Sequence, residues 1–160
     1  LVAKLNRYQY ANYDAILNAE KEKDNSDTGV KNAIYAEVLR PDPAVKEKWF
    51  NTVINNPDEL KLSTLRWIMY GLFPSEQRHL EAPYKERIYT QIEHLNNGSD
   101  LSLLSSFVNT MIPTNCTAES EQELAKMVTK YADMKPQVVK SVKGNHEGVD
   151  RCVKALKLLN

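Results

Sequence analysis

The sequence lacks the features of several large protein classes. Glycine is scarce, at 5 of 160 residues, and the seven prolines fall mostly between segments of regular apolar spacing, as in an all-helical chain. No segment alternates apolar and polar residues over six positions, so no strand is expected. No apolar run approaches the roughly 20 residues that a membrane-spanning helix needs, and we expect no membrane partner.

The sequence also lacks an excess of charge of either sign. Lys+Arg and Asp+Glu both number 21, so the formal net charge is zero. Because nucleic-acid-binding domains usually carry a basic excess, we expect no nucleic-acid partner. A net charge near zero instead favours association with another surface. A length of 160 residues with 42% hydrophobic residues fits one folded domain over residues 1–160.

Cysteine is nearly absent, with only Cys116 and Cys152 in the chain. One disulfide between them can form, but the sequence favours two free thiols in a reducing compartment. They have neither CxxC spacing nor nearby paired ligands, so no zinc site is expected on them. The chain begins at Leu1 without Met and shows no leader pattern, which indicates a start inside a longer protein. We expect a cytoplasmic location.

Apolar residues recur at helical spacing along the whole chain, which predicts seven or eight helices joined by short loops. The expected ranges are 3–23, 28–40, 43–54, 62–72, 75–95, 101–111, 118–131 and 136–160. Short loops imply antiparallel neighbours, and the predicted fold is all-α, with helix pairs stacked as a short α-solenoid, a HEAT-like superhelix. A compact bundle is the competing architecture.

Local signals mark the ends of these helices. Side chains that can accept backbone N–H groups precede four of them, namely Asp27 or Thr28, Asp42, Asp100 and Thr117. Gly98 or Asn97 suits a left-handed cap at the end of the 75–95 helix. Trp49 and Trp67 lie within apolar stripes, so both are expected in the core.

The stretch from His146 to Asp150 resembles a damaged HExxH motif. A zinc-binding helix needs two ligands at i and i+4, with the Glu between them as general base. Asp150 would have to be the second ligand, Gly148 weakens the helix, and no third ligand is evident. Since His146 also falls on the apolar stripe of its helix, we interpret it as a partly buried, hydrogen-bonded histidine.

No other arrangement of reactive side chains is evident. His79 and His94 lie beside charged residues on helices, and no Ser-His-Asp or Cys-His arrangement can be supported from the sequence. Neither GxGxxG nor GxxxxGK[ST] occurs, so nucleotide binding has no motif. We therefore assign no catalytic, cofactor-binding or metal-binding residue to this chain.

Three tyrosines, Tyr8, Tyr10 and Tyr13, crowd the first expected helix. Packing between helices, with the hydroxyl at the rim, is the simpler interpretation. The alternative is that some of them line a groove for a peptide. The cations that would then meet a peptide carboxylate are Lys4, Arg7 and Arg66.

Three stretches carry a further pattern. In Pro41–Trp49, the pair Lys46-Glu47 precedes the aromatic residue Trp49 on an expected helix. The stretch Leu62–Tyr84 contains Leu72-Phe73-Pro74-Ser75-Glu76-Gln77 and then Leu80-Glu81-Ala82-Pro83-Tyr84. The last stretch, residues 136–160, carries Asn145, Glu147, Asp150, Arg151, Cys152 and Val153. In their order and spacing they resemble the C-terminal helical domain of zinc aminopeptidases of the aminopeptidase N type, over roughly residues 27–160.

The resemblance implies a parent enzyme, a gluzincin metalloprotease and hydrolase, that removes N-terminal residues from peptides. In that family the HExxH motif, a downstream glutamate ligand and a Gly-x-Met-Glu-Asn motif belong to upstream domains, and none occurs here. Zinc would therefore lie in the parent's catalytic domain, with no cofactor in this chain. Its partner would be that domain of the same polypeptide, with the peptide substrate contacted indirectly.

Two other functions stay open beside this one. The chain could be a free-standing helical-repeat scaffold that binds a peptide or protein partner. The third hypothesis is a self-contained enzyme that uses His146 or Cys152. Because the chain alone carries no catalytic motif, we expect it to be inactive by itself.

Overall fold

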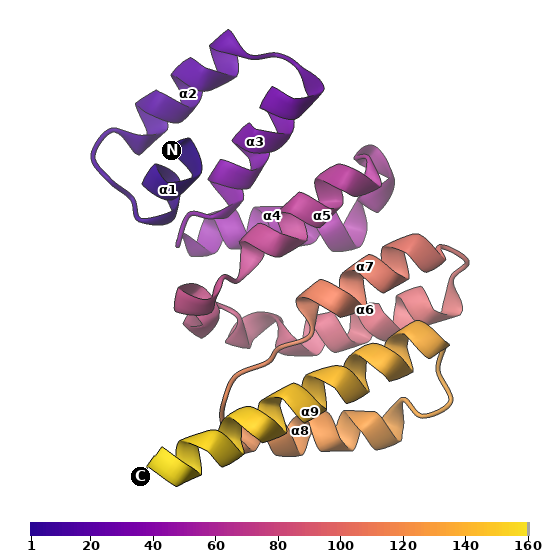
Figure 1. Ribbon diagram of the computed structural model, residues 1–160. Coiled ribbons are helices and arrows are strands. Elements are labelled where there is room, and N and C mark those ends of the chain that lie inside the picture. The colour runs from indigo at the N-terminus through magenta and orange to yellow at the C-terminus, as the bar shows by residue number, and fades with distance from the viewer. Residues whose placement is uncertain (160) are drawn as a thin grey trace. The chain divides into compact units, whose positions relative to one another are not determined.

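The computed structural model describes residues 1–159, and these are all-α, with 79% helix and no strand among them (Figure 1). The α-helices are α1 (Val2–Arg7), α2 (Tyr13–Lys23), α3 (Asp27–Val38), α4 (Pro43–Asn55), α5 (Leu62–Leu72), α6 (Lys85–Asn97), α7 (Leu101–Met111), α8 (Ala118–Lys130) and α9 (Pro136–Leu159). Short 3-10 helices cover Pro57–Glu59, Ser75–Leu80 and Ala82–Tyr84. The predicted all-α class is confirmed.

The chain divides into two compact units, Leu1–Ala82 and Pro83–Asn160. In the first unit, α3 packs on α1, α2, α4 and α5, and α4 packs on α5. In the second, α6 packs on α7, α7 packs on α9, and α8 packs on α9. The predicted packing of helices in neighbouring pairs is therefore present within each unit. Along the described part of the chain, no helix is long and apolar enough to cross a bilayer.

Capping side chains begin most helices where the sequence predicts them. Asp42, Asp100 and Thr117 accept backbone N–H groups at the starts of α4, α7 and α8. The expectation for α3 was wrong, because Ser26 is its cap and accepts the Gly29 N–H at 3.1 Å. The Asp27 carboxylate instead pairs with Lys31 at 2.6 Å and with Lys61 at 2.8 Å.

The expected helix over residues 3–23 is wrong, because the chain breaks between α1 and α2. Gln9 and Asn12 adopt left-handed backbone conformations, with φ values of 49° and 63°. Asn is among the residues that tolerate this conformation best. The break allows α1 and α2 each to pack on α3, and Leu17 of α2 is buried in a cluster with Ala33 and Ala36 of α3.

The expected helix over residues 75–95 is only partly present. Its first part forms two 3-10 turns, and α6 begins at Lys85. Pro83 lacks an N–H group and disfavours a continuous α-helix through this segment. Gln77 anchors the turns, since its side-chain amide donates to the Leu39 carbonyl at 2.9 Å.

The predicted left-handed cap after α6 is also wrong. Gly98 has an extended backbone, with φ −81° and ψ 179°. Carbonyl groups at the end of α6 instead accept hydrogen bonds from Lys135, which lies just before α9. Its ammonium donates to the carbonyls of Asn96 and Gly98. A cation at this helix end also suits the helix dipole.

The two tryptophans differ from each other. Trp49 is 8% exposed, as expected for the core, and its indole N–H donates to Glu37 at 3.2 Å. Trp67 is 44% exposed, so its assignment to the core was wrong. The buried core of the first unit contains Phe50, Val53, Leu65, Ile68, Met69 and Leu72. That of the second contains Ile88, Ile92, Leu104, Phe107, Leu124, Val138 and Val142.

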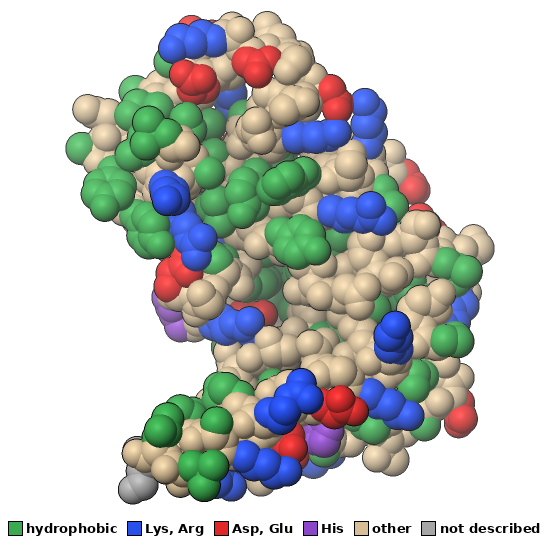
Figure 2. All heavy atoms as spheres, viewed as in Figure 1, with side chains coloured by type: hydrophobic (Ala, Val, Ile, Leu, Met, Phe, Trp, Pro, Cys, Tyr) green, Lys and Arg blue, Asp and Glu red, His purple; other side chains and the backbone are tan. Residues whose placement is uncertain are grey.

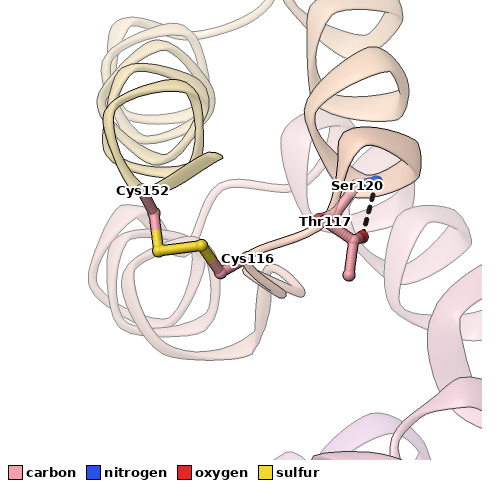
Figure 3. The surroundings of a disulfide bond; sticks show 4 residues. All are labelled: Cys116, Thr117, Ser120 and Cys152. Atoms are coloured by element: carbon pink, nitrogen blue, oxygen red, sulfur yellow. Dashed lines mark hydrogen bonds between the residues drawn. A yellow bond between two sulfur atoms is a disulfide. The ribbon is translucent and has the colours of Figure 1, made fainter. Parts of the chain in front are cut away.

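The prediction of two free thiols is wrong. Cys116 and Cys152 form a disulfide that joins the segment before α8 to the later part of α9 (Figure 3). The two cysteines lie 36 residues apart in sequence. Because α8 and α9 pack on each other, the chain returns Cys152 to the start of α8. The pairing depends on how α8 and α9 pack, so the absence of CxxC spacing in the sequence could not exclude it.

Candidate functional site

The helix α5 carries two stripes of side chains rather than one. Its buried stripe consists of Leu65, Ile68, Met69 and Leu72. A second stripe follows the spacing i, i+3, i+4, i+7 and consists of Ser63, Arg66, Trp67 and Tyr70. Because residues at this spacing share one face of a helix, α5 presents an aromatic face outside its core contacts.

Tyr35 of α3 completes this aromatic face. The rings of Tyr35 and Trp67 meet edge to face, with centroids 4.9 Å apart and an interplanar angle of 65°. Trp67 is 44% exposed and Tyr70 is 64% exposed. Hydrophobic side chains gather over α1, α3 and α5 on the face shown in Figure 2. A hollow of about 520 Å³, here called the aromatic groove, is lined by Tyr35, Ser63, Arg66, Trp67 and Tyr70.

A second hollow adjoins the aromatic groove. It has a volume of about 420 Å³ and shares Tyr35 and Trp67 with the groove. Its other lining residues include the apolar Leu1, Val2, Ala3 and Leu17 and the acidic Glu20 and Asp24. Binding sites for peptides and small molecules are commonly concave and mostly apolar, with a few polar groups that orient the ligand. The two hollows together have this character.

Gly71 allows α3 and α5 to approach closely beside the groove. A Cβ atom at this position would lie 3.0 Å from the Val38 side chain and 3.3 Å from the Tyr35 ring. These distances are tighter than ordinary van der Waals contact, so a Cβ atom here would require Val38 or Tyr35 to shift by a few tenths of an ångström. The glycine therefore allows the Val38 and Tyr35 side chains of α3 to lie directly against α5.

Lys46 connects the ends of the two helices that form the groove. Its side chain is fully buried, and its ammonium donates to the carbonyls of Val38, at 2.7 Å, and Gly71, at 3.3 Å. These carbonyls belong to the last turns of α3 and α5, where a cation is favourable. Burial lowers the pKa of Lys46 to about 7, since the charged form is disfavoured away from water.

Arg7 is engaged within the first unit. Its guanidinium donates to both carboxylate oxygens of Glu76, and this hydrogen-bonded pairing lowers the pKa of Glu76 to about 2. Arg7 is therefore committed to Glu76 rather than placed for a peptide carboxylate. Of the other two candidate cations, Arg66 lines the groove, whereas Lys4 does not. Tyr8 and Tyr10 are exposed, at 56% and 60%, and lie outside both hollows.

His146 is half-buried and bonded as expected. Its Nε2 lies 3.1 Å from the Glu121 carboxylate, while Asp150 pairs with Lys154 at 2.8 Å. Over residues 1–159, no group of three or more His, Cys, Asp or Glu side chains is placed to hold a metal ion. His79 and His94 are both exposed.

No protein-family model matches the chain, and no curated protein matches its sequence. What the fold and the site define is therefore a class: an all-α protein of neighbouring helix pairs with an exposed aromatic groove on its first unit.

Sequence analysis missed the groove because it assigned each helix a single apolar stripe. The signal was present in α5, where Trp67 and Tyr70 fall off the stripe that Ile68 and Leu72 define. Lys46 was missed in a similar way. It precedes Phe50 by four residues on the buried face of α4, and a charged residue at such a position indicates a buried, partnered group.

Proposed function

We propose that this chain is the non-catalytic C-terminal helical domain of a zinc-dependent aminopeptidase. In this role it packs on the upstream catalytic domain of the same polypeptide and encloses the cavity that holds the peptide substrate. The aromatic groove is the observation that carries the proposal, because a domain of this kind needs an exposed apolar surface for another domain or a peptide. Trp67 and Tyr70 provide such a surface.

The stretches that resemble the family have defined structural roles, which supports the proposal. Pro41–Trp49 contributes the Asp42 cap of α4 and the buried Lys46. Within Leu62–Tyr84, Gln77 bonds the Leu39 carbonyl. Within α9, Cys152 forms the disulfide. The resembling residues therefore stabilise helix contacts, which is what a supporting domain requires.

An enclosing domain contributes to catalysis without a reactive residue of its own. Exclusion of water strengthens electrostatic interactions inside a closed site. Opening and closing of such a domain can also limit turnover through product release. The chain would therefore act through its shape and its contacts.

The same groove favours one alternative, a free-standing helical-repeat scaffold that binds a peptide. Its lining combines three aromatic rings with the polar Arg66 and Ser63, and the rings suit apolar side chains of an extended peptide. In this alternative the groove itself is the functional site, and no zinc or peptidase activity accompanies the chain.

The disulfide changes the compartment that we propose. The expected cytoplasmic location rested partly on free thiols, and Cys116 and Cys152 are instead paired. Because disulfides persist mainly in secreted proteins and in the lumen of the secretory pathway, we propose that the protein works in an oxidising compartment.

The experiment that tests the proposal is the isolation of the native gene product, followed by its intact mass, zinc content and aminopeptidase activity. We expect a product several times heavier than the 18.3 kDa of this chain, with about one catalytic zinc ion and activity that a chelator abolishes. A native product of about 18.3 kDa without zinc would contradict the peptidase role. Peptide binding by such a product, lost on Trp67→Ser, would then support the scaffold.

A further inference from the structure

Two short stretches of the chain have the spacing of an N-glycosylation acceptor. They are Asn97-Gly98-Ser99 and Asn115-Cys116-Thr117. In this spacing a Ser or Thr lies two residues after the Asn, and the residue between them is not proline. Glycans are attached to such sequences on the surfaces of proteins that enter the secretory pathway. The spacing alone occurs by chance in many proteins, so its position in the structure decides its meaning.

The disulfide provides independent support for the required compartment. Cys116 and Cys152 are bonded to each other, and disulfides form in the oxidising lumen where N-glycans are also attached. The acceptor spacing and the disulfide are thus two separate features that indicate the same route through the cell.

Asn97 lies just before the turn between α6 and α7, where its side chain is accessible. It is the last residue of α6, and Asn97, Gly98 and Ser99 are all exposed. The neighbouring residues hold the turn in place, because Asn96 accepts the Lys135 backbone N–H at 2.9 Å and Gly98 accepts the Lys135 ammonium. Among residues 1–159, the Asn97 carboxamide has no hydrogen-bond partner. A glycan can be attached there without breaking a contact.

Asn115 lies in a more constrained segment. It is half-buried, and its carbonyl accepts the Thr117 backbone N–H at 2.9 Å. The Thr117 hydroxyl caps α8 by accepting the Ser120 N–H at 3.2 Å, and Cys116 forms the disulfide (Figure 3). Each residue of this acceptor sequence thus has a structural role, which makes Asn115 the poorer of the two sites.

We propose that Asn97 is an N-glycosylation site. In the reaction, the Asn97 side-chain nitrogen forms a bond to C1 of the first N-acetylglucosamine of a lipid-pyrophosphate-linked oligosaccharide. The bond from that carbon to the pyrophosphate oxygen breaks, the lipid pyrophosphate leaves, and the amide nitrogen loses one proton to a base of the transferase. The site does not depend on whether the chain belongs to a peptidase.

Glycosylation of Asn97 also identifies one edge of the second unit as solvent-facing. The turn between α6 and α7 would carry a bulky hydrated group, which excludes close contact with another domain at that edge. Any partner of the second unit would then contact a different part of its surface.

The test uses the full chain, directed into the secretory pathway of eukaryotic cells by an added leader. Enzymatic removal of N-glycans in heavy-oxygen water converts each glycosylated Asn into a labelled Asp, which peptide mass spectrometry locates. We expect label at Asn97 in most molecules, and less label at Asn115. Because Asn-Gly sequences also deamidate spontaneously, the label is counted above that of a sample incubated without the enzyme. Ser99→Ala should reduce the label at Asn97 to this enzyme-free level, whereas the matched variant Ser99→Thr should retain the excess.

Folding of the variants is checked by far-ultraviolet circular dichroism and the thermal midpoint, which Ser99→Ala should leave unchanged because Ser99 is exposed. Absence of label at Asn97 in the unsubstituted chain would overturn the proposal. So would label above the enzyme-free level in Ser99→Ala, or a higher occupancy at Asn115 than at Asn97. The same mapping on the native protein should again find Asn97 modified, and an unmodified Asn97 there would also refute the site.

Discussion

At the scale of single residues, Lys46 is the least ordinary group in the first unit. A fully buried ammonium is costly unless it is partnered, and the partners here are two carbonyls at helix ends. The carbonyls of Val38 and Gly71 in turn need a donor, because they lie in the last turns of α3 and α5. The same side chain therefore joins three helices, and its burial makes its charge depend on pH.

Lys46→Met should change how stability depends on pH. Because the pKa of Lys46 is about 7 in the folded chain and 10.5 as its reference value, the unfolded chain binds more protons between these values. Lys46 therefore contributes a rise in the free energy of unfolding as pH increases from about 7 to about 10. Urea denaturation at pH 7 and pH 10 should show a rise in the free energy of unfolding. The rise should be larger by about 3 kcal/mol in the unsubstituted chain than in Lys46→Met.

The matched control is Lys4→Met, which removes an exposed lysine of the same unit and should leave the rise unchanged. Glu81, whose pKa burial raises to about 7, acts equally in all three proteins. Parallel pH dependences in Lys46→Met and the unsubstituted chain would show that Lys46 is not buried as described. At neutral pH the variant should also be destabilised by about 1–3 kcal/mol, since two carbonyls lose their donor.

Residue-scale prediction from sequence succeeded where a local contact decides the outcome. Asp42, Asp100 and Thr117 cap helices because the groups that they accept lie only two or three residues away. It failed for Trp67, whose exposure depends on which face of α5 meets α3 and α4. The sequence of α5 alone does not show which of its faces is covered by these helices.

At the scale of elements, the helices with one clear stripe and a clear stop were predictable. The start of α4 at Pro43 and the end of α5 at Leu72 match the expected boundaries. The break before α2 was not predictable, because residues around Asn12 suit a helix as well as a turn, and contact with α3 decides between them. The groove was unpredictable for the same reason, since it requires Tyr35 of one helix to meet Trp67 of another.

The pairing of α8 and α9 carries the second prediction. The disulfide closes a loop over 36 residues, and chain-entropy arguments give such a link about 3–4 kcal/mol of stability. Cys152→Ser should therefore lower the thermal midpoint of the chain. A reducing agent should lower the unsubstituted chain to the level of the variant and leave the variant itself unaffected. An equal effect of the reducing agent on both proteins, or on neither, would contradict a stabilising disulfide.

At the scale of the whole molecule, the net charge and the groove both favour association with another surface. The formal net charge is zero, so long-range repulsion does little to keep copies apart. The aromatic groove exposes Trp67 and Tyr70, and exposed apolar patches often mark interaction sites. Both proposed functions, the enclosing domain and the peptide-binding scaffold, require this surface to be covered when the protein works. The isolated chain leaves it open.

The isolated chain should therefore associate with itself in a concentration-dependent way at neutral pH. Sedimentation velocity over a range of concentrations should show a rising average mass. The double variant Trp67→Ser, Tyr70→Ser should suppress the association. The matched control Tyr8→Ser, Tyr10→Ser removes two comparably exposed aromatic side chains outside the groove and should not suppress it. If both double variants reduce the association equally, the association depends on exposed aromatic side chains in general. This result would contradict the prediction that the groove is the surface that a partner covers.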